Sequence, residues 1–88
     1  MSDGFTDRLA AEVRTRRAAL GLTQRDLADM AGVSERFVRF VEQGKPSIQL
    51  DSLIAVLETL GLELGLATRT SHAARVLTGH SGDQESPR

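Results

Sequence analysis

The first hydrophobic residues of the chain recur with the period of a helix. They are spaced by about one or two helical turns and are Phe5, Leu9, Val13 and Leu20. This pattern predicts a helix from about Thr6 to Leu20, closed by Gly21 as its C-terminal cap. Arg17 falls on the apolar stripe of that helix, where a charged side chain requires a partner.

A second amphipathic segment begins at Thr23. The hydroxyl of Thr23 is suited to cap a helix, and Asp26 stands three residues later in the position of the acid of a capping box. The pattern predicts a helix from about Gln24 to Ala31. Its inward positions are Leu27, Ala28 and Ala31.

A tight turn separates this segment from a third one. Gly32 permits the positive φ of such a turn, and Ser34 is suited to cap the helix that follows, from about Glu35 to Gln43. Gly44 ends that helix. The inward positions of the helix are Val38, Val41 and part of Phe37.

A loop follows and leads into a fourth helix. It contains Lys45-Pro46-Ser47, in which the proline prevents a helix from continuing, and runs to about Leu50. Either Asp51 or Ser52 caps the fourth helix, and Gly61 ends it. The buried stripe expected for this helix consists of Leu53, Ile54, Leu57 and Leu60.

After Gly61 the hydrophobic period changes from about 3.6 to two. Leu62, Leu64 and Leu66 alternate with smaller or charged residues, which is typical of a half-buried strand. No other strand is predicted, so either residues 62–68 do not form a strand or they pair with the same segment of a second copy of the chain, and we favour this pairing. Residues 69–88 are polar and are expected to form a flexible tail, in which residues 73–77 are compatible with one or two helical turns.

Length and composition restrict the class of protein. The 88 residues suffice for one small domain, and the absence of cysteine excludes disulfides and thiolate metal sites. Three phenylalanines are the only aromatic residues, so the core is expected to consist of aliphatic side chains in packed helices. The sequence has no apolar run long enough to span a membrane, and its N-terminus does not resemble a secretion signal. We therefore expect a cytoplasmic protein.

The overall charge does not indicate a nucleic-acid-binding protein. Lys and Arg number 11 and Asp and Glu number 12, which gives a net charge of −1. DNA-binding domains commonly have a pI above 9, whereas the pI of this chain is about 6.1. Residues 1–50 hold 8 basic and 7 acidic residues, so any DNA-binding function depends on where the few cations lie.

The two central segments nevertheless resemble a known DNA-binding motif. Matching stretches in order are Leu20-Gly21-Leu22-Thr23-Gln24, Leu27-Ala28, Gly32-Val33-Ser34 and Glu42-Gln43-Gly44-Lys45. Their spacing is similar to that of the Cro/C1-type (Xre-like) helix-turn-helix family of phage repressors. The resemblance implies an all-α, four-helix helix-turn-helix domain over residues 5–61, followed here by a dimerisation strand at residues 62–68 and the tail at residues 69–88.

A narrower resemblance extends toward the C-terminus. Its stretches are Gly44-Lys45-Pro46-Ser47, Leu50-Asp51, Val56-Leu57 and Leu60-Gly61-Leu62-Glu63-Leu64. They are similar to HipB-type antitoxins, which bind DNA and pair with HipA-like kinase toxins. That family dimerises partly through a C-terminal strand, and the resemblance implies such a role for Leu62, Leu64 and Leu66.

The family's recognition helix lies in the major groove, which assigns roles to the third helix. The candidates for reading bases are Glu35, Arg36, Arg39 and Phe40. Arg36 is the first choice because a guanidinium can bond guanine O6 and N7, and Glu35 can accept from the cytosine N4 amine. Arg39 is also suited to phosphate or to a solvated surface position. Two roles stay open for Phe40, which can contact a thymine methyl group or cover the core.

The resemblance also places phosphate contacts and one internal ion pair. The candidates for phosphate contact are Thr23, Gln24, Gln43 and Lys45, with a solvated surface charge as the alternative for Lys45. Arg17 and Glu42 both fall on apolar stripes, and the family pairs them as a structural ion pair.

Other chemistry is not indicated. His72 and His80 lie in the polar tail without an arrangement of carboxylates, so neither a metal site nor a Ser-His-Asp triad is expected. We expect no enzyme and no cofactor.

The sequence thus favours a homodimeric repressor that binds a palindromic double-stranded DNA operator. Its narrower form is the antitoxin of a type II toxin-antitoxin pair, which autoregulates its operon and binds a HipA-like kinase. The alternatives are a stand-alone regulator of the Xre family and an interaction module that does not bind DNA.

Overall fold

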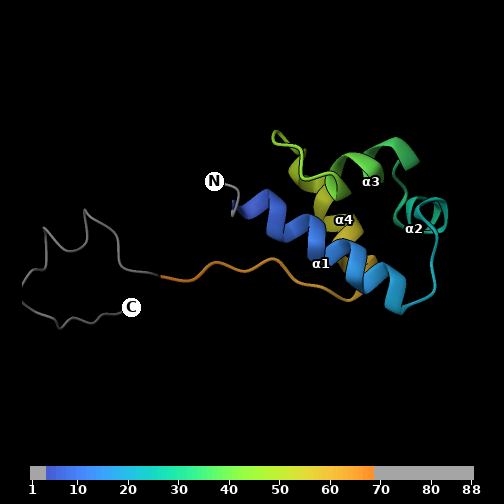
Figure 1. Ribbon diagram of the computed structural model, residues 1–88, viewed down its shortest axis with the longest axis horizontal. Helices are drawn as coiled ribbons and strands as arrows, with labels where there is room; N and C mark the ends of the chain where they lie inside the picture. Colours follow the sequence, from blue (N-terminus) through green and yellow to red (C-terminus); the bar gives the residue numbers. More distant parts are fainter. Residues whose placement is uncertain (1–3, 69–88) are drawn as a thin grey trace, which may run out of the picture.

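The computed structural model describes residues 4–68, and this part of the chain forms four helices (Figure 1). They are α1 (Phe5–Ala19), α2 (Gln24–Ala31), α3 (Glu35–Glu42) and α4 (Leu50–Leu60). The predicted all-α, four-helix architecture is confirmed. Helix α2 has the predicted bounds, and α1 and α3 end one residue earlier than predicted.

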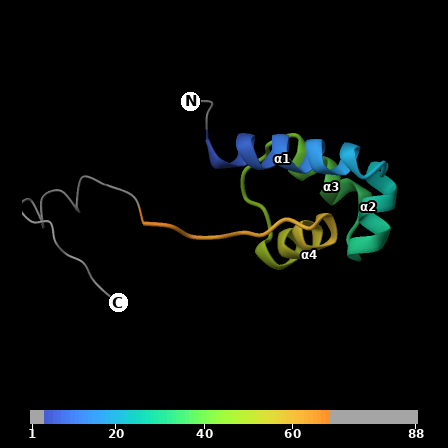
Figure 2. The same ribbon diagram turned by 90° about the horizontal axis from the view of Figure 1, so that it is seen from below.

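The four helices enclose a core of aliphatic side chains. Helix α1 packs against α3 and α4. Helix α2 packs against the same two helices and lies near the C-terminal end of α1 (Figure 2). The buried core residues are Leu9, Val13, Leu27, Ala28, Val38, Val41, Leu53, Val56, Leu57 and Leu60. As the composition predicted, the core contains no buried aromatic ring, and Phe37 packs against it only partly buried.

Three residues of the predicted buried stripes are exposed instead. Phe5 and Leu20 lie at the two ends of α1, where 53% and 45% of their surface stays open to solvent. Ile54 is 38% exposed because the buried face of α4 consists of Leu53, Val56, Leu57 and Leu60 at helical spacing. Ile54 lies about 100° around the helix from Leu53 and therefore falls at the edge of that face.

The predicted cap of α4 is wrong. The N-cap is Gln49, whose side chain forms no capping hydrogen bond. The chain enters the helix at Leu50, so Asp51 and Ser52 already lie in its first turn, where the Asp51 Oδ1 accepts from the Ser52 backbone N–H at 2.7 Å.

Two glycines fix the turns around α3. Gly32, with φ of 75°, forms the left-handed C-cap of α2 and permits the short connection to α3. Gly44, with φ of 72°, ends the turn after α3 next to the start of α1. A Cβ atom at Gly44 would lie 3.0 Å from the Asp7 Oδ1, so both conformation and space favour glycine there.

The segment after α4 is not a strand within the single chain. Residues 62–68 have no regular secondary structure and lead away from the helices (Figures 1 and 2). The Leu62 backbone N–H donates to the Leu57 carbonyl at 2.8 Å, but no strand pairs with this segment in the described part of the chain. The predicted tail, including residues 73–77, lies outside the described residues. Among the helices that the structure does describe, none is long and apolar enough to cross a membrane.

Candidate nucleic-acid interface

The buried valines of α3 determine which of its faces points outward. Val38 and Val41 are completely buried, and the Ser34 hydroxyl caps the helix by accepting from the Phe37 backbone N–H at 3.0 Å. The opposite face consequently presents the predicted base-reading residues to solvent. Arg36 and Arg39 are exposed, while Glu35 and Phe40 are half-buried.

Two of the predicted base-reading residues are joined to each other. The Arg39 Nη1 donates to the Glu35 Oε2 at 2.9 Å, and both side chains are more than 40% exposed. Such an exposed pair one helical turn apart contributes only about 0.3 to 0.5 kcal/mol, so a nucleic acid can separate it. Arg36 forms no ion pair or hydrogen bond through its side chain within the described residues, which leaves its guanidinium available.

Phe40 lines a hollow beside α3. The walls of this hollow are Ser34, Arg36, Phe37, Phe40, Ser47 and Gln49. The loop residue Ser47 reaches it with a φ of 63°, a left-handed conformation that is uncommon outside glycine. Phe40 is half-buried and lines this hollow together with Arg36.

The structure joins Arg17 and Glu42 across α1 and α3. The Arg17 Nε donates to the Glu42 Oε2 at 2.6 Å and the Arg17 Nη2 donates to the Glu42 Oε1 at 2.9 Å. Glu42 is 5% exposed, so its carboxylate requires these partners. The Arg17 Nη1 also donates to the Leu22 carbonyl at 2.9 Å, which ties the turn between α1 and α2 to the same cluster.

Gln24, a predicted phosphate contact, belongs to this cluster as well. Its Nε2 donates to the Glu42 Oε1 at 3.0 Å. An amide nitrogen has two hydrogens, so this bond leaves one donor of Gln24 available. The position of Gln24 at the start of α2 is therefore fixed by the ion pair.

The cluster keeps the Glu42 carboxylate ionised. Burial raises the pKa of Glu42, but hydrogen bonds from Arg17 and Gln24 and the positive charges of Arg17 and Arg14 outweigh burial. The pKa of Glu42 consequently lies below its ordinary value. The hydrogen bond to Glu42 likewise raises the pKa of Arg17, so the guanidinium remains charged.

The start of α2 carries the predicted capping box. The Thr23 Oγ1 accepts from the Asp26 backbone N–H, and the Asp26 Oδ2 accepts from the Thr23 backbone N–H, both at 2.9 Å. Hydrogen bonding of the Asp26 carboxylate to the Thr23 backbone, and then to the Thr23 side chain, lowers the pKa of Asp26. The hydroxyl of Thr23 therefore caps the helix, while the backbone N–H groups of Gln24 and Arg25 form no hydrogen bond within the described residues.

Two further arginines of α1 are bonded inside the fold and are not free for a ligand. The Arg14 Nη1 donates to the Glu42 carbonyl at 2.7 Å, and the Arg16 Nε donates to the Leu60 carbonyl at 2.8 Å. These carbonyls belong to the last residues of α3 and α4, whose helix ends favour positive charge. Together with Arg17, two further basic residues of the N-terminal half thus stabilise helix ends and turns.

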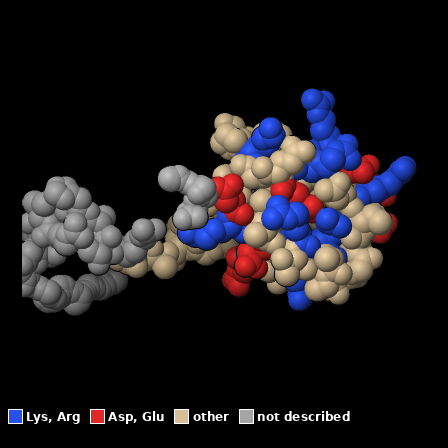
Figure 3. Space-filling view, in the orientation of Figure 1, with Lys and Arg blue, Asp and Glu red and all other residues tan. Residues whose placement is uncertain are grey.

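Arg8 of α1 is exposed and forms no side-chain bond within the described residues, and the other available cations lie around α2 and α3. Figure 3 shows several of them projecting over α2 and α3, without a continuous basic field. Lys45 and Gln43 are exposed in the turn after α3. Arg25, in the first turn of α2, is also exposed and forms no side-chain bond in the described part of the chain, although the sequence analysis did not single it out. The signal that could have identified Arg25 as a candidate phosphate contact is its position directly after Gln24.

Within residues 4–68 no group of His, Asp and Glu is arranged to hold a metal ion. His72 and His80 lie outside the described residues.

Comparison with known proteins agrees with the geometry of α2 and α3. The family described as helix-turn-helix matches residues 13–66. The chain is 40% identical over 58 residues to the uncharacterised HTH-type transcriptional regulator y4mF of Sinorhizobium fredii, a match that covers 66% of this chain and 76% of that protein. It is 33% identical over 58 residues to an uncharacterised HTH-type transcriptional regulator of Haemophilus influenzae, which covers 66% of this chain and 59% of that protein.

Proposed function

The chain belongs to the helix-turn-helix family, and from this membership we propose that it is a homodimeric repressor that reads a palindromic operator through α3. It is a DNA-binding transcriptional regulator of the helix-turn-helix type and not an enzyme. The observation that carries the proposal is the outward face of α3. Arg36 is exposed on that face with a free guanidinium, although Arg14, Arg16 and Arg17 are all used within the fold.

In the proposed complex the N-terminal part of α3 enters the major groove. Arg36 binds guanine O6 and N7, a contact worth about 1 to 3 kcal/mol of discrimination. Glu35 and Arg39 read neighbouring bases once their mutual ion pair opens, and the exposed edge of Phe40 contacts a thymine methyl group.

Phosphates are bound on both sides of this helix. The start of α2 meets one phosphate through its open backbone N–H groups and the remaining donor of Gln24, where the helix dipole adds positive charge. Thr23 contributes by capping the helix end that faces this phosphate, and Arg25 adds a neighbouring cation. Gln43 and Lys45 contact a phosphate beyond the end of α3.

The dimer is formed by the segment after α4. Leu62, Leu64 and Leu66 alternate along a backbone that has no pairing partner in the described chain, which favours pairing with the same segment of a second copy. A two-fold axis then places the two α3 helices on half-sites about 34 to 36 Å apart.

A finer assignment rests on the resemblance of residues 44–64 to HipB-type antitoxins. We propose that the repressor autoregulates an operon that also encodes a HipA-like kinase and that it binds this kinase. The test is an adjacent kinase reading frame whose product co-purifies with the chain. A genome without such a neighbour favours a stand-alone regulator instead.

DNA reading is tested with operator DNA selected from a random library by the full chain. We expect Arg36→Ala to weaken binding to this DNA by about ten-fold or more, because a bidentate base contact is lost. Arg36→Lys keeps the charge but not the fork geometry and is expected to lose sequence preference. Arg69→Ala, which removes the same charge beyond the family match at residues 13–66, is the control and is expected to bind like the wild type. Equal affinity of all four proteins would contradict base reading by Arg36. If the full chain selects no DNA from the library, the interaction module without DNA binding is favoured.

A further inference from the structure

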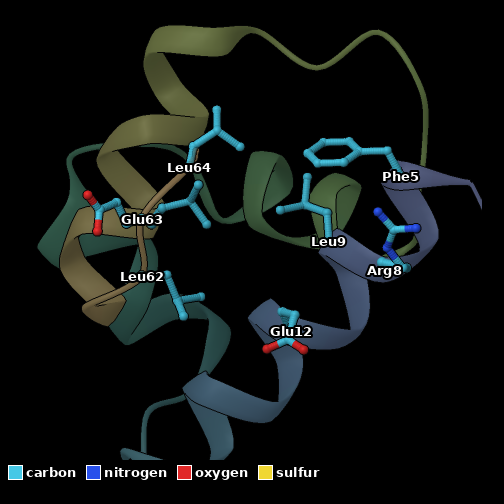
Figure 4. A pocket seen from close by; sticks show the side chains of 8 residues that line it. Phe5, Arg8, Leu9, Glu12, Leu62, Glu63 and Leu64 are labelled. Carbon is cyan, nitrogen blue, oxygen red and sulfur yellow. The ribbon is translucent and has the colours of Figure 1, made fainter. Parts of the chain in front are cut away.

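An apolar groove lies where the chain leaves α4. It is formed by the first half of α1, the end of α4 and the segment after it, and its lining residues are Phe5, Arg8, Leu9, Glu12, Leu57, Leu62, Glu63 and Leu64. Figure 4 shows Phe5 and Leu64 on opposite sides of the groove with Leu9 between them. At about 280 Å³ it is smaller than the roughly 300 to 1,000 Å³ of small-molecule sites, so it suits one or two side chains.

Several apolar side chains in and beside the groove remain exposed to solvent in the single chain. Phe5 and Leu64 are 53% and 39% exposed, and Ile54 borders a second hollow on the other side of Leu64 with 38% exposure. Two residues beyond Leu64, the Leu66 side chain is completely exposed. Burying one such side chain contributes about 1.5 to 3 kcal/mol, so both the groove and Leu66 favour a partner.

We propose that Leu66 of a second copy occupies this groove, in an antiparallel strand pair centred on Gly65. The inference rests on the proposed dimer and adds its register and its receiving surface. Side chains of directly opposite residues share one face of a strand pair, so a two-fold pair must be centred on a residue and not between two residues.

Three observations favour Gly65 as the centre. A pair centred there uses the whole of residues 62–68 and places Leu66 of the second copy directly opposite Leu64, which lines the groove. Glu63 then lies opposite Ala67, whereas a centre at Glu63 would place two like charges together. The Leu62 backbone N–H already donates to α4, which is consistent with Leu62 occupying a position that forms no hydrogen bond to the partner strand.

The register can be tested by cross-linking because the chain contains no cysteine. Gly65 has open space around the position of a Cβ atom and no positive φ, so Gly65→Cys is expected to fold normally. Directly opposite residues in a hydrogen-bonded pair have Cα atoms about 5.5 Å apart, within the roughly 4.4 to 6.8 Å range of disulfides. We expect Gly65→Cys to form a cross-linked dimer faster than Leu64→Cys or Leu66→Cys alone. Mixing the last two variants is expected to give the cross-linked heterodimer.

The groove is tested by the dissociation constant of the dimer, measured by sedimentation of the full chain. Phe5→Ala and Leu66→Ala are each expected to raise this constant by about ten-fold or more, while circular dichroism shows unchanged helix content. In the double variant the second substitution is expected to have a smaller effect than it has alone. Leu77→Ala, in the tail, is the control and is expected to leave the constant unchanged.

The outcomes separate this inference from the proposed dimer. A dimer that cross-links preferentially at Leu64 or is insensitive to Phe5→Ala overturns the register and the groove and keeps the dimer. A dimer weakened by Leu77→Ala but not by Leu66→Ala identifies the tail as the occupant and likewise overturns the inference. A wild-type chain that is monomeric at micromolar concentration overturns both.

Discussion

Glu42 stands on an apolar face of α3, yet its carboxylate is stable there because Arg17 and Gln24 bind it. The bonds are 2.6 to 3.0 Å long and join α1, α2 and α3. The apolar stripes predicted that Arg17 and Glu42 each require a partner, and the resemblance to the repressor family paired them with each other. The contacts of Arg14 and Arg16 could not be predicted from the sequence. Arg14 binds a backbone carbonyl 28 residues away and Arg16 binds one 44 residues away. Because every residue has a backbone carbonyl, the sequence does not indicate which one an arginine binds. Only the packed fold identifies those carbonyls.

Glu42→Gln is expected to destabilise the protein by about 3 kcal/mol, since it leaves the guanidinium of Arg17 without its counter-charge. The loss is measured by urea unfolding at one fixed protein concentration, with Asp29→Asn as an exposed control that is expected to change little. A double-mutant cycle with Arg17→Met is expected to give a coupling of at least about 1 kcal/mol. Zero coupling would show that the pair does not stabilise the fold.

The same variant has a predicted pH dependence. The pKa of Glu42 is lower in the folded chain than in the unfolded one, so its stabilising effect is complete above the unfolded value of about 4.3. The effect disappears as the pH falls below that value through the folded pKa. Between pH 7 and pH 3 the wild type is therefore expected to lose more unfolding free energy than Glu42→Gln, and equal losses would contradict the assigned direction of the pKa shift.

At the scale of elements, caps and apolar periodicity predict three of the four helices closely. Helix α2 begins with a complete capping box at Thr23 and Asp26, and its bounds are as predicted. Helix α4 departs from prediction because its N-cap is Gln49, whose side chain forms no capping hydrogen bond. The helical stripe predicts Ile54 in the core, although its angular position lies at the edge of the buried face.

Thr23→Ala is expected to reduce the stability of the domain by about 1 kcal/mol, because the Asp26 backbone N–H loses its acceptor. For a domain of this size the melting temperature is expected to fall by about 4 to 8 °C. Thr23→Ser retains the hydroxyl and is expected to behave like the wild type. Thr15→Ala removes an exposed threonine within α1 and serves as the matched control. A fall of similar size in the control would exclude capping as the cause.

For the whole molecule, the distribution of cations explains how a chain with a net charge of −1 can bind DNA. Several arginines bind helix ends and Glu42, whereas Arg25, Arg36 and Lys45 remain exposed near α2 and α3. So few free cations give one protomer weak affinity for phosphates. The account consequently requires two protomers on one operator. The sequence predicted this requirement from residues 62–68, while the groove that receives Leu66 depends on the packing of Phe5 and Leu64 in space.

The most direct test of this account is the affinity of the full chain for its selected operator when the two half-sites are moved apart. Inserting five base pairs between them turns one half-site by about half a helical turn, so one dimer can no longer engage both with its α3 helices. We predict that fluorescence anisotropy shows a loss of affinity of at least about ten-fold, while changing the same number of spacer bases without altering the length has little effect. Unchanged affinity for the lengthened operator would contradict recognition by a two-fold dimer.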